Sequence, residues 1–431
     1  MHPKYVAIKK VEFFFQFSTR AGNSDIHFEF QGELGCRVFK ARVESRKMHD
    51  STKIIRSTLT GVAAGEPLHV SPVFAAPYHT PGDPANSPYS YARSHNPTWT
   101  ALERALGQME SGQFATGHAD AGKSYRAAAL VFASGMAACA AIFGAVLRPG
   151  DVAVLPENAY FAARVLMQNY FVKMGIILRL APTVGEAQGE HLEGARLLWI
   201  ETPSNPTMDV CDIAALCERA HLAGALVAVD NTTATPLGQR TLALGADFSV
   251  ASDTKSMTGH SDILLGHVAA RDRELLQKIE EWRTLMGGVL GPMEAWLALR
   301  SIATLPLRLE RSCENAQRIA EYLATRTDVV QSVLYPGLPT HPGHVIAARQ
   351  MNYFGAVLSF NLVDKAAAET FLDKAKLITE ATSFGGTCTC AERRARWGGD
   401  AVPEGFIRLS AGLEHIDDLI ADIAQALDSV L

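Results

Sequence analysis

The stretch Ser252-Asp-Thr-Lys-Ser-Met-Thr-Gly-His-Ser-Asp262 follows the short apolar run Phe248-Ser-Val-Ala-Ser252. A run of this length that ends in polar residues is typical of a buried strand. Lys255, just beyond such a strand, is poorly placed for packing but well placed to form a Schiff base with a cofactor aldehyde. The hydroxyls of Ser252 and Thr254 precede it at alternate positions and suit the phosphate of that cofactor. The alternative is an exposed lysine in a polar loop, which is the usual place for a lysine.

The motif S-x-T-K followed by G-H-S-D resembles the pyridoxal phosphate (PLP) site of the Cys/Met-metabolism enzymes, the family of cystathionine and methionine lyases and synthases. The resemblance runs from about Met48 to Leu431. It implies an α/β protein of PLP-dependent transferase fold type I (aspartate aminotransferase-like), with a mostly parallel central sheet and a smaller C-terminal α+β domain. It also implies PLP as the cofactor, a homodimer as the minimal active unit and a homotetramer as the expected assembly.

The bulk composition excludes several classes of protein. The 431 residues, 48% of them hydrophobic, suffice for a large domain plus a smaller one. The formal net charge of -5 gives no reason to expect nucleic acid or a membrane surface as a partner. The sequence has no run of about eighteen apolar residues, so no membrane span is predicted. The 7 cysteines are scattered and odd in number, which favours a reduced, cytoplasmic protein, and Cys388 and Cys390 lack a second pair at zinc-site spacing, so no metal is expected.

Short apolar runs alternate with helical stretches after residue 127, which indicates a parallel sheet covered on both faces. Strands are expected at 128–132, 151–155, 176–180, 197–200, 226–230, 248–252 and 263–269, and helices at 136–147, 163–173, 213–222 and 271–285. After a long helical stretch at 294–327, strands are expected at 329–334, 356–362, 377–382 and 406–409, and helices at 344–351, 366–375 and 416–431. The predicted organisation is 48–110 as N-terminal arm and helix, 111–292 as large PLP-binding domain, and 293–431 as linking helix and C-terminal domain.

Residues 1–47 differ from the rest of the chain and carry no catalytic pattern. Val11-Glu-Phe-Phe-Phe-Gln-Phe17 is aromatic and β-prone, and the segment is neither a secretory signal nor a convincing transit peptide. Met48 opens a stretch that resembles the usual start of the family. Two interpretations stay open: translation begins at Met48, so that 1–47 is a mis-annotated start, or the segment is a genuine extra strand or arm.

Two glycine-containing segments suggest phosphate binding, and their contexts differ. Gly117-His-Ala-Asp-Ala-Gly-Lys-Ser124 satisfies the P-loop pattern, but it follows a polar stretch and precedes a strand, so it is interpreted as a solvated loop. Ser134-Gly-Met136 instead follows a strand and opens a helix. Gly135 allows a close backbone approach, and the free amides and helix dipole favour an anion. A simple tight turn between strand and helix is the alternative.

Asp230 ends the apolar run Ala225-Leu-Val-Ala-Val-Asp230, at the edge where parallel sheets bind ligands. Its expected role is to keep the pyridine nitrogen of the cofactor protonated, while a helix N-cap is the alternative. By resemblance, Tyr160 stacks on the cofactor ring and acts as an acid or base at the substrate; a buried core aromatic is the alternative.

Three further residues are predicted to bind the substrate. Glu201-Thr-Pro-Ser-Asn-Pro-Thr207 matches the family pattern E-[ST]-P-x-N-P, and the resemblance implies that Asn205 contacts the cofactor oxygen or the substrate carboxylate; an Asx-type turn competes with this reading. Arg408 lies on an apolar strand, where burial without an anionic partner would be costly, and it matches the family arginine for the substrate α-carboxylate. Ser383 precedes Phe384-Gly-Gly386 and completes this set.

Tyr91-Ala-Arg93 resembles the family Y-x-R, whose tyrosine and arginine reach the phosphate in the neighbouring subunit. An arginine suits a phosphate because its guanidinium donates two parallel hydrogen bonds. By the same resemblance, Lys255 moves the α-proton and Lys255 or Tyr160 protonates the departing sulfur, with Tyr91 as a third catalytic residue.

The family is more strongly indicated than the reaction. The expected activity is that of a cystathionine γ-lyase, which yields cysteine, 2-oxobutanoate and ammonia. The alternatives are γ-replacement (a cystathionine γ-synthase or an O-acylhomoserine sulfhydrylase), a methionine γ-lyase, or a PLP-binding regulatory homologue. Ala162 stands where methionine γ-lyases carry cysteine, Thr382 where many cystathionine γ-lyases carry glutamate, and Ser256 where an aromatic residue is common. Arg393, Arg394 and Arg396 are interpreted as a solvated face, with a site for a second substrate carboxylate as the alternative.

Overall fold

The computed structural model describes residues 14–20, 23–30, 37–41, 48–59, 64–112 and 129–431. The P-loop-like segment predicted to be a solvated loop, 117–124, lies outside these residues. By its internal contacts the chain divides into two units, Met1–His49 and Asp50–Leu431. The first unit contains an antiparallel three-stranded sheet of β1 (Phe14–Arg20), β2 (Asn23–Phe30) and β3 (Arg37–Ala41).

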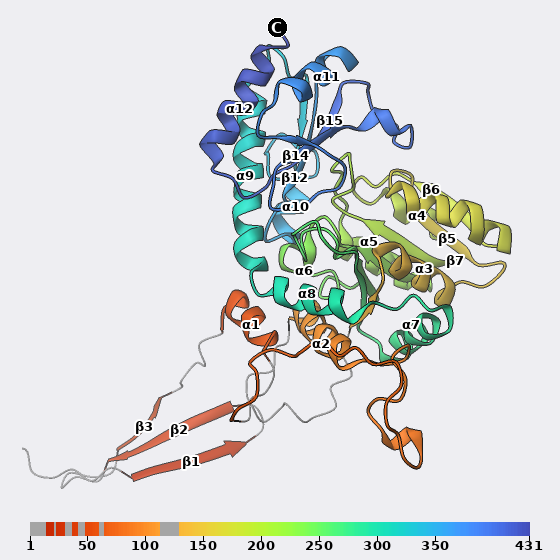
Figure 1. Cartoon of the computed structure of the whole chain (residues 1–431), viewed down its shortest axis with the longest axis vertical. Helices are drawn as coiled ribbons and strands as arrows, with labels where there is room; N and C mark the ends of the chain where they lie inside the picture. The colour runs from red at the N-terminus through yellow and green to blue at the C-terminus, as the bar shows by residue number, and fades with distance from the viewer. Residues whose placement is uncertain (1–13, 21–22, 31–36, 42–47, 60–63, 113–128) are drawn as a thin grey trace, which may run out of the picture. The chain divides into compact units, whose positions relative to one another are not determined.

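The second unit is built around a seven-stranded sheet (Figure 1). In spatial order its strands are β4 (Ala129–Phe132), β10 (Gly266–Ala270), β9 (Phe248–Ala251), β8 (Leu226–Asp230), β7 (Ala195–Glu201), β5 (Val152–Pro156) and β6 (Ile177–Ala181). The pairs from β9 to β6 are parallel, whereas β10 runs antiparallel to both of its neighbours. The expectation of a mostly parallel sheet is therefore confirmed.

Alternate side chains of this sheet enter two separate hydrophobic cores. Val131 and Val154 belong to one core, and their neighbours Leu130 and Ala153 to the other. Side chains alternate across a strand, so the two cores lie on opposite faces of the sheet. The helices of this part of the chain are α1 (Asp50–Ser57), α2 (Pro97–Ser111), α3 (Gly135–Val146), α4 (Phe161–Leu166), α5 (Ile213–Leu222), α6 (Thr235–Gly238), α7 (Arg273–Met286) and α8 (Pro292–Ile302).

Polar side chains set where several of these helices begin. Ser134 caps α3 by accepting a hydrogen bond from the Ala137 amide at 3.1 Å, and Asp212 caps α5 by accepting from Ala215 at 3.2 Å. Each cap satisfies one of the amides that a helix leaves without an internal partner. For α3 this fixes the first turn after β4, where Gly135 approaches Ser252 closely.

A second, five-stranded sheet forms the C-terminal part. The long helix α9 (Leu305–Thr325) connects the main sheet to this part (Figure 1). Its strands, in spatial order, are β11 (Ser332–Leu334), β12 (Val357–Asn361), β15 (Phe406–Ser410), β14 (Cys390–Arg393) and β13 (Thr379–Glu380). The accompanying helices are α10 (His344–Gln350), α11 (Lys365–Lys374) and α12 (Ile416–Asp428). The predicted α+β unit is therefore present.

The structure differs from the predicted elements in several places. The helix expected at 294–327 is two helices, α8 and α9, which break around Ala303 and Thr304 just before Pro306. The strand expected at 263–269 begins only at Gly266, because the Leu265 backbone bonds to Thr254. Strand β14 was not predicted. Among the described residues, no helix is long and apolar enough to cross a membrane.

Candidate active site

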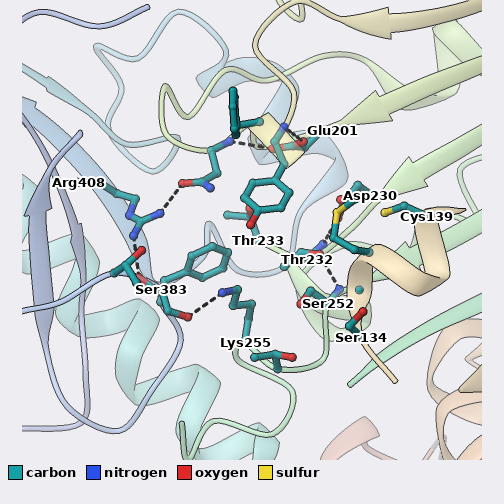
Figure 2. Close-up of a pocket in the computed structure, with 18 of the residues that line it drawn as sticks. Ser134, Cys139, Glu201, Asp230, Thr232, Thr233, Ser252, Lys255, Ser383 and Arg408 are labelled. Carbon is teal, nitrogen blue, oxygen red and sulfur yellow. Dashed lines mark hydrogen bonds between the residues drawn. The ribbon is translucent and has the colours of Figure 1, made fainter. Parts of the chain in front are cut away.

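A cavity of about 440 Å³ lies where the carboxyl ends of the main-sheet strands face the C-terminal sheet. Parallel strands present ligand-binding residues at this edge. The cavity brings together eleven of the predicted site residues, several of which are shown in Figure 2. They are Ser134, Gly135, Met136, Tyr160, Asn205, Asp230, Ser252, Thr254, Lys255, Ser383 and, on the far wall, Arg408.

Lys255 reaches into this cavity from the segment that follows β9. Its Nζ donates a 2.7 Å hydrogen bond to Ser383 Oγ and lies 5.1 Å from the centre of the Phe384 ring (Figure 2). Burial, and next the positive charge of Arg408, lower the pKa of Lys255 to about 8. An amine with such a pKa is partly neutral near neutral pH, and only the neutral amine is a nucleophile or a base. The alternative of an exposed lysine in a polar loop is therefore wrong.

A cradle for an anion forms between the start of α3 and the segment after β9. The first amides of a helix have no internal partner, and here they belong to Gly135 and Met136. A Cβ on Gly135 would lie 2.5 Å from the Cβ of Ser252, so only glycine permits this approach. The Ser252 hydroxyl lies beside this glycine, and Thr254 also lines the cavity. Thr254 Oγ1 is also hydrogen bonded to the Leu265 backbone, which holds this hydroxyl in place.

Two buried carboxyl groups end neighbouring strands at the floor of the cavity. Asp230 of β8 and Glu201 of β7 lie directly opposite each other in the strand register, and both line the cavity. Burial raises the pKa of both groups, and for Glu201 the charge of Asp230 raises it further. Asp230 Oδ1 accepts a 3.0 Å hydrogen bond from the Thr232 amide. This local bond is also what a turn-capping role would give, so it leaves the cofactor role of Asp230 a prediction.

Glu201 joins two predicted site residues to each other. Its Oε2 accepts a hydrogen bond from the Tyr160 amide at 2.6 Å, and its Oε1 accepts one from the Asn205 amide at 3.1 Å. The Tyr160 side chain is 44% exposed and lines the cavity, so it is not a core aromatic. Burial of its hydroxyl raises the pKa of Tyr160, while the charge of Arg394 opposes that rise.

A hydrogen-bonded group on the opposite wall is centred on Arg408 of β15. Its guanidinium donates to Asn205 Oδ1 at 2.9 Å and to the Ser383 carbonyl at 2.8 Å (Figure 2). It also donates to the carboxylate of Glu392. Ser383 has a φ of 81°, a backbone conformation that is costly for a residue with a side chain and that often occurs at functional sites. Burial lowers the pKa of Arg408 to about 10, and Glu392 opposes this effect.

The expected solvated face is wrong for Arg393, which ends β14, and for Arg394, which follows it, because each is only 8% exposed. Arg396 is exposed, and it pairs with Glu392 at 3.0 Å. Arg394 lines the cavity, and its positive charge is compensated by Glu392 and Asp400.

Tyr91 and Arg93 lie apart from the cavity lining, and the Arg93 guanidinium sits 5.6 Å from the centre of the Tyr91 ring. Their expected role belongs to a neighbouring subunit and stays a prediction.

Several residues that line the cavity were not predicted from the sequence. Glu201 stood in a quoted motif but received no role, although a carboxylate at the end of a predicted strand was the available signal. Thr232, Thr233 and Cys139 also line the cavity, and no pattern distinguished them in the sequence. Among the described residues, no group of three or more His, Cys, Asp and Glu side chains is arranged to hold a metal.

The residues fit a phosphorylated aromatic aldehyde. The glycine cradle offers amides and hydroxyls to a phosphate, the buried Asp230 suits a protonated ring nitrogen, and Lys255 supplies an amine of lowered pKa.

Comparison with known proteins agrees with this chemistry. Residues 56–428 match the family model described as Cys/Met metabolism PLP-dependent enzyme. The chain is 54% identical over 379 residues, or 88% of its length and 93% of the relative, to a putative cystathionine gamma-lyase of Streptomyces coelicolor. It is 40% identical to a cystathionine gamma-synthase of Mycobacterium tuberculosis, over 79% of the chain and 86% of the relative.

Solved structures indicate the same family. A cystathionine gamma synthase from Xanthomonas oryzae pv. oryzae, in complex with aminoacrylate and cysteine, matches 89% of this chain and 98% of its own, with a TM-score of 0.80 and 34% identity. The expected α/β fold of PLP-dependent fold type I is thereby confirmed. The chain belongs to the Cys/Met metabolism PLP-dependent enzymes, the trans-sulfuration family, and its cofactor is pyridoxal phosphate.

Proposed function

We propose that this protein cleaves the Cγ–S bond of cystathionine, so that cystathionine and water give cysteine, 2-oxobutanoate and ammonia. The observation that carries the choice of reaction is the 54% identity, over most of both chains, with a putative cystathionine gamma-lyase. The cavity supports an amino-acid substrate because it combines a buried amine of lowered pKa with a buried arginine.

The cofactor supplies an electron sink that stabilises negative charge at the α-carbon of a bound amino acid. Lys255 would hold it covalently through Nζ. The amides of Gly135 and Met136 would bind its phosphate, together with the hydroxyls of Ser134, Ser252 and Thr254. Asp230 would keep its ring nitrogen protonated, and Tyr160 would lie against its ring.

The remaining residues bind the substrate and move protons. The Arg408 guanidinium binds the α-carboxylate, with Asn205 and Ser383 fixing its orientation through the hydrogen bonds described above. Lys255 Nζ takes the proton from the α-carbon, for which its pKa of about 8 is suitable. The hydroxyl of Tyr160, or Lys255 Nζ, gives a proton to the departing sulfur.

Assembly and location are part of the same proposal. Tyr91 and Arg93 bind the phosphate in the partner's site, so the minimal active unit is a homodimer and the expected assembly a homotetramer. Arg93 suits this role because its guanidinium is not held by an ion pair among the described residues. A cytoplasmic location is consistent with the free cysteines of the described part of the chain.

γ-Replacement is the second candidate, favoured by the 40% identity with a cystathionine gamma-synthase. The two reactions share the cavity and differ in whether a nucleophile enters after the sulfur leaves. Methionine γ-elimination is a weaker candidate because of Ala162. A protein of Micromonospora echinospora that is described both as a methionine gamma lyase and as a cystathionine gamma lyase is 34% identical.

One experiment separates these reactions. The purified holoenzyme is supplied in turn with cystathionine, with methionine, with cysteine, and with O-acetylhomoserine plus cysteine, and the products are identified by mass spectrometry. Release of 2-oxobutanoate and cysteine from cystathionine, faster than any other conversion, supports the proposal. Faster formation of cystathionine from O-acetylhomoserine and cysteine would replace it with γ-replacement, and turnover of methionine alone would replace it with methionine γ-elimination.

A further inference from the structure

The outer wall of the active-site cavity carries a charged pair that the proposed chemistry does not use. Arg394, Trp397, Gly399 and Asp400 of the C-terminal part all line the cavity. The side chains of Arg394 and Asp400 are only 10% and 6% exposed. Their ion pair compensates the cost of burying each charge, and it places two charged side chains in the cavity wall to which the proposed chemistry gives no role.

This wall is fixed to the opposite side of the cavity. A Cβ on Gly399 would lie 2.8 Å from the Phe161 ring, so the loop packs closely on the start of α4. Arg164 Nη2 also donates a 2.8 Å hydrogen bond to the Gly399 carbonyl. The loop that carries Asp400 is therefore held in place without a ligand, which reduces the entropy cost of binding one.

A chain of ion pairs leads from the proposed α-carboxylate site to this wall. Glu392 Oε1 accepts hydrogen bonds from both Arg408 and Arg394. Arg394 then donates to Asp400 Oδ2 through Nε, at 3.0 Å, and through Nη2. Arg394 therefore shares a carboxylate oxygen with Arg408, and Asp400 lies one ion pair further along, so the chain of charges leads away from the proposed α-carboxylate site.

Both partners keep unused hydrogen-bonding capacity. Asp400 Oδ1 has no hydrogen-bond partner among the residues that the structure describes, since both bonds from Arg394 reach Oδ2. A guanidinium has five N–H donors, and the side-chain bonds of Arg394 use three of them. The pair is neutral as a whole and presents one acceptor and two donors of opposite charge side by side.

We propose that Arg394 and Asp400 bind the second amino-acid head of a two-headed thioether substrate. The guanidinium binds the distal carboxylate and Asp400 Oδ1 binds the distal ammonium. A zwitterion fits this neutral pair better than a lone anion, which Asp400 would repel. The aromatic rings of Trp397 and Phe161 line the same cavity and suit the thioether chain between the two heads.

This inference rests on the proposed function and sharpens it. Thr382, which the family resemblance places at a common glutamate position, carries no charge. The other charged residues in the cavity lining are assigned to the cofactor and the first head, apart from Glu201, which binds two backbone amides. Among the described residues, the Arg394–Asp400 pair is therefore what remains to recognise the distal head.

The test combines a variant with a chemical change in the substrate. Asp400→Asn keeps the shape and an acceptor for Arg394 but removes the charge. Three substrates are compared: cystathionine, cystathionine acetylated on its distal nitrogen, and S-propylhomocysteine, which lacks the distal head. Glu404→Gln is the matched control, because Glu404 pairs with Arg393 at 2.7 Å in the same segment but does not line the cavity. KM and kcat are measured for each holoenzyme, with the cofactor absorbance as a check on folding.

In Asp400→Asn we expect KM for cystathionine to rise ten- to hundredfold, the range for a lost charged hydrogen bond, with kcat changed less than threefold. KM for S-propylhomocysteine should change less than twofold in either variant. Acetylation should raise KM in the wild type by a similar factor and add little further in Asp400→Asn. An unchanged KM for cystathionine in this variant, or full additivity of the two changes, would overturn the inference.

The substrate comparison in the wild type keeps the result interpretable even where Asp400→Asn fails to fold. Equal KM values for acetylated and unmodified cystathionine would by themselves refute recognition of the distal ammonium. A wild-type enzyme that does not cleave cystathionine at all would instead refute the proposed function, so the two failures are distinguishable.

Discussion

Replacement of His267 by leucine should destabilise the protein by several kcal/mol and change how its stability depends on pH. His267 is fully buried on β10, between two carboxylates. Its Nδ1 lies 2.8 Å from Asp253 Oδ1, and its Nε2 lies 2.9 Å from Glu110 Oε1. Ser249 also donates to that Glu110 oxygen at 2.9 Å. Leucine would fill the space but leave both carboxylates without their cation.

The magnitude follows from the titration of the imidazole. Burial lowers the pKa of His267, but the charges and hydrogen bonds of Asp253 and Glu110 outweigh burial and raise it to about 10. A rise from about 6.5 corresponds to roughly 4 to 5 kcal/mol of preference for the charged form. Loss of one partner from a buried ion pair costs a similar amount, about 3 to 5 kcal/mol.

The pKa values of His267 and Asp253 suggest different strengths for their interaction. Burial raises the pKa of Asp253 although His267 contacts it, so the carboxylate gains less from the contact than the imidazole does. We base the predicted loss of stability on the pKa of His267, because this pKa is raised only if the carboxylates beside it are ionised. Burial of Asp253 costs free energy, so the whole cluster stabilises the fold less than the pKa of His267 alone suggests. The same burial makes removal of His267 more damaging, because Asp253 would then be buried without a cation.

The pH dependence has a definite sign. A raised pKa contributes stability that is fully present below the unfolded value, about 6.5, and is lost as pH rises through about 10. The stability difference between the wild type and His267→Leu should therefore be largest near pH 6.5 and shrink towards pH 10. Urea unfolding of both holoenzymes, followed by circular dichroism across this range with excess cofactor, measures it.

An exposed pair provides the control. His221 and Asp247 are also 2.9 Å apart, but their side chains are 41% and 21% exposed. His221→Leu should therefore cost less than about 1 kcal/mol at every pH. A loss in His267→Leu as small as this, or a large loss that does not change between pH 6.5 and 10, would refute the reasoning.

Three further predictions concern the cofactor site. The rate at which apoenzyme binds PLP covalently should rise with pH around a midpoint near 8, because only neutral Lys255 reacts and its pKa is about 8. Absorbance measures this rate. Recovery of the borohydride-reduced cofactor on another lysine would contradict the assignment of Lys255. Asp230→Ala should keep the cofactor bound but lower kcat by several orders of magnitude, whereas more than a tenth of the activity would indicate that Asp230 only caps a turn. Lys255→Ala and Arg93→Ala should each be inactive alone, but a mixture of the two that is dissociated and reassembled should recover roughly a quarter of wild-type activity. About half of the random dimers are mixed, and each mixed dimer has one intact site of two. No recovery would mean that Arg93 acts in its own chain.

The main sheet and most of the cavity were predictable because their signals are local. A buried strand is a short apolar run, and the polar residue that follows it lies at the ligand-binding edge of a parallel sheet. Ser134, Asp230 and Lys255 were found in this way, and all three line the cavity. Glu201 carried the same local signal but received no role. Its bonds to Tyr160 and Asn205 depend on how their strands and loops are placed side by side, which the sequence does not show.

Strand β14 escaped prediction because its side chains are charged. A single buried arginine or glutamate is costly, so a segment rich in both is expected to lie in water. In the fold, however, Glu392 is fully buried and accepts hydrogen bonds from three arginines, one of them on β15 and the others just beyond β14. Burial lowers the acidity of Glu392, but the charge of Arg408 and the hydrogen bonds from Trp397 and Arg394 outweigh this, so its pKa is below the ordinary value.

The order of acidic and basic residues along such a segment therefore indicates whether it is buried better than the number of its charged residues does. A solvated face needs no particular balance of signs, whereas a buried segment must compensate each charge. Between Glu392 and Asp400 the acidic residues stand at the two ends and the arginines between them, and Arg394 bonds to both ends. Beside a predicted carboxylate-binding arginine, this pattern favours a wall of the active site over a solvated surface. The same compensation leaves Asp400 and Arg394 in the cavity as a fixed, neutral pair, which is the property that the proposed recognition of a second amino-acid head requires.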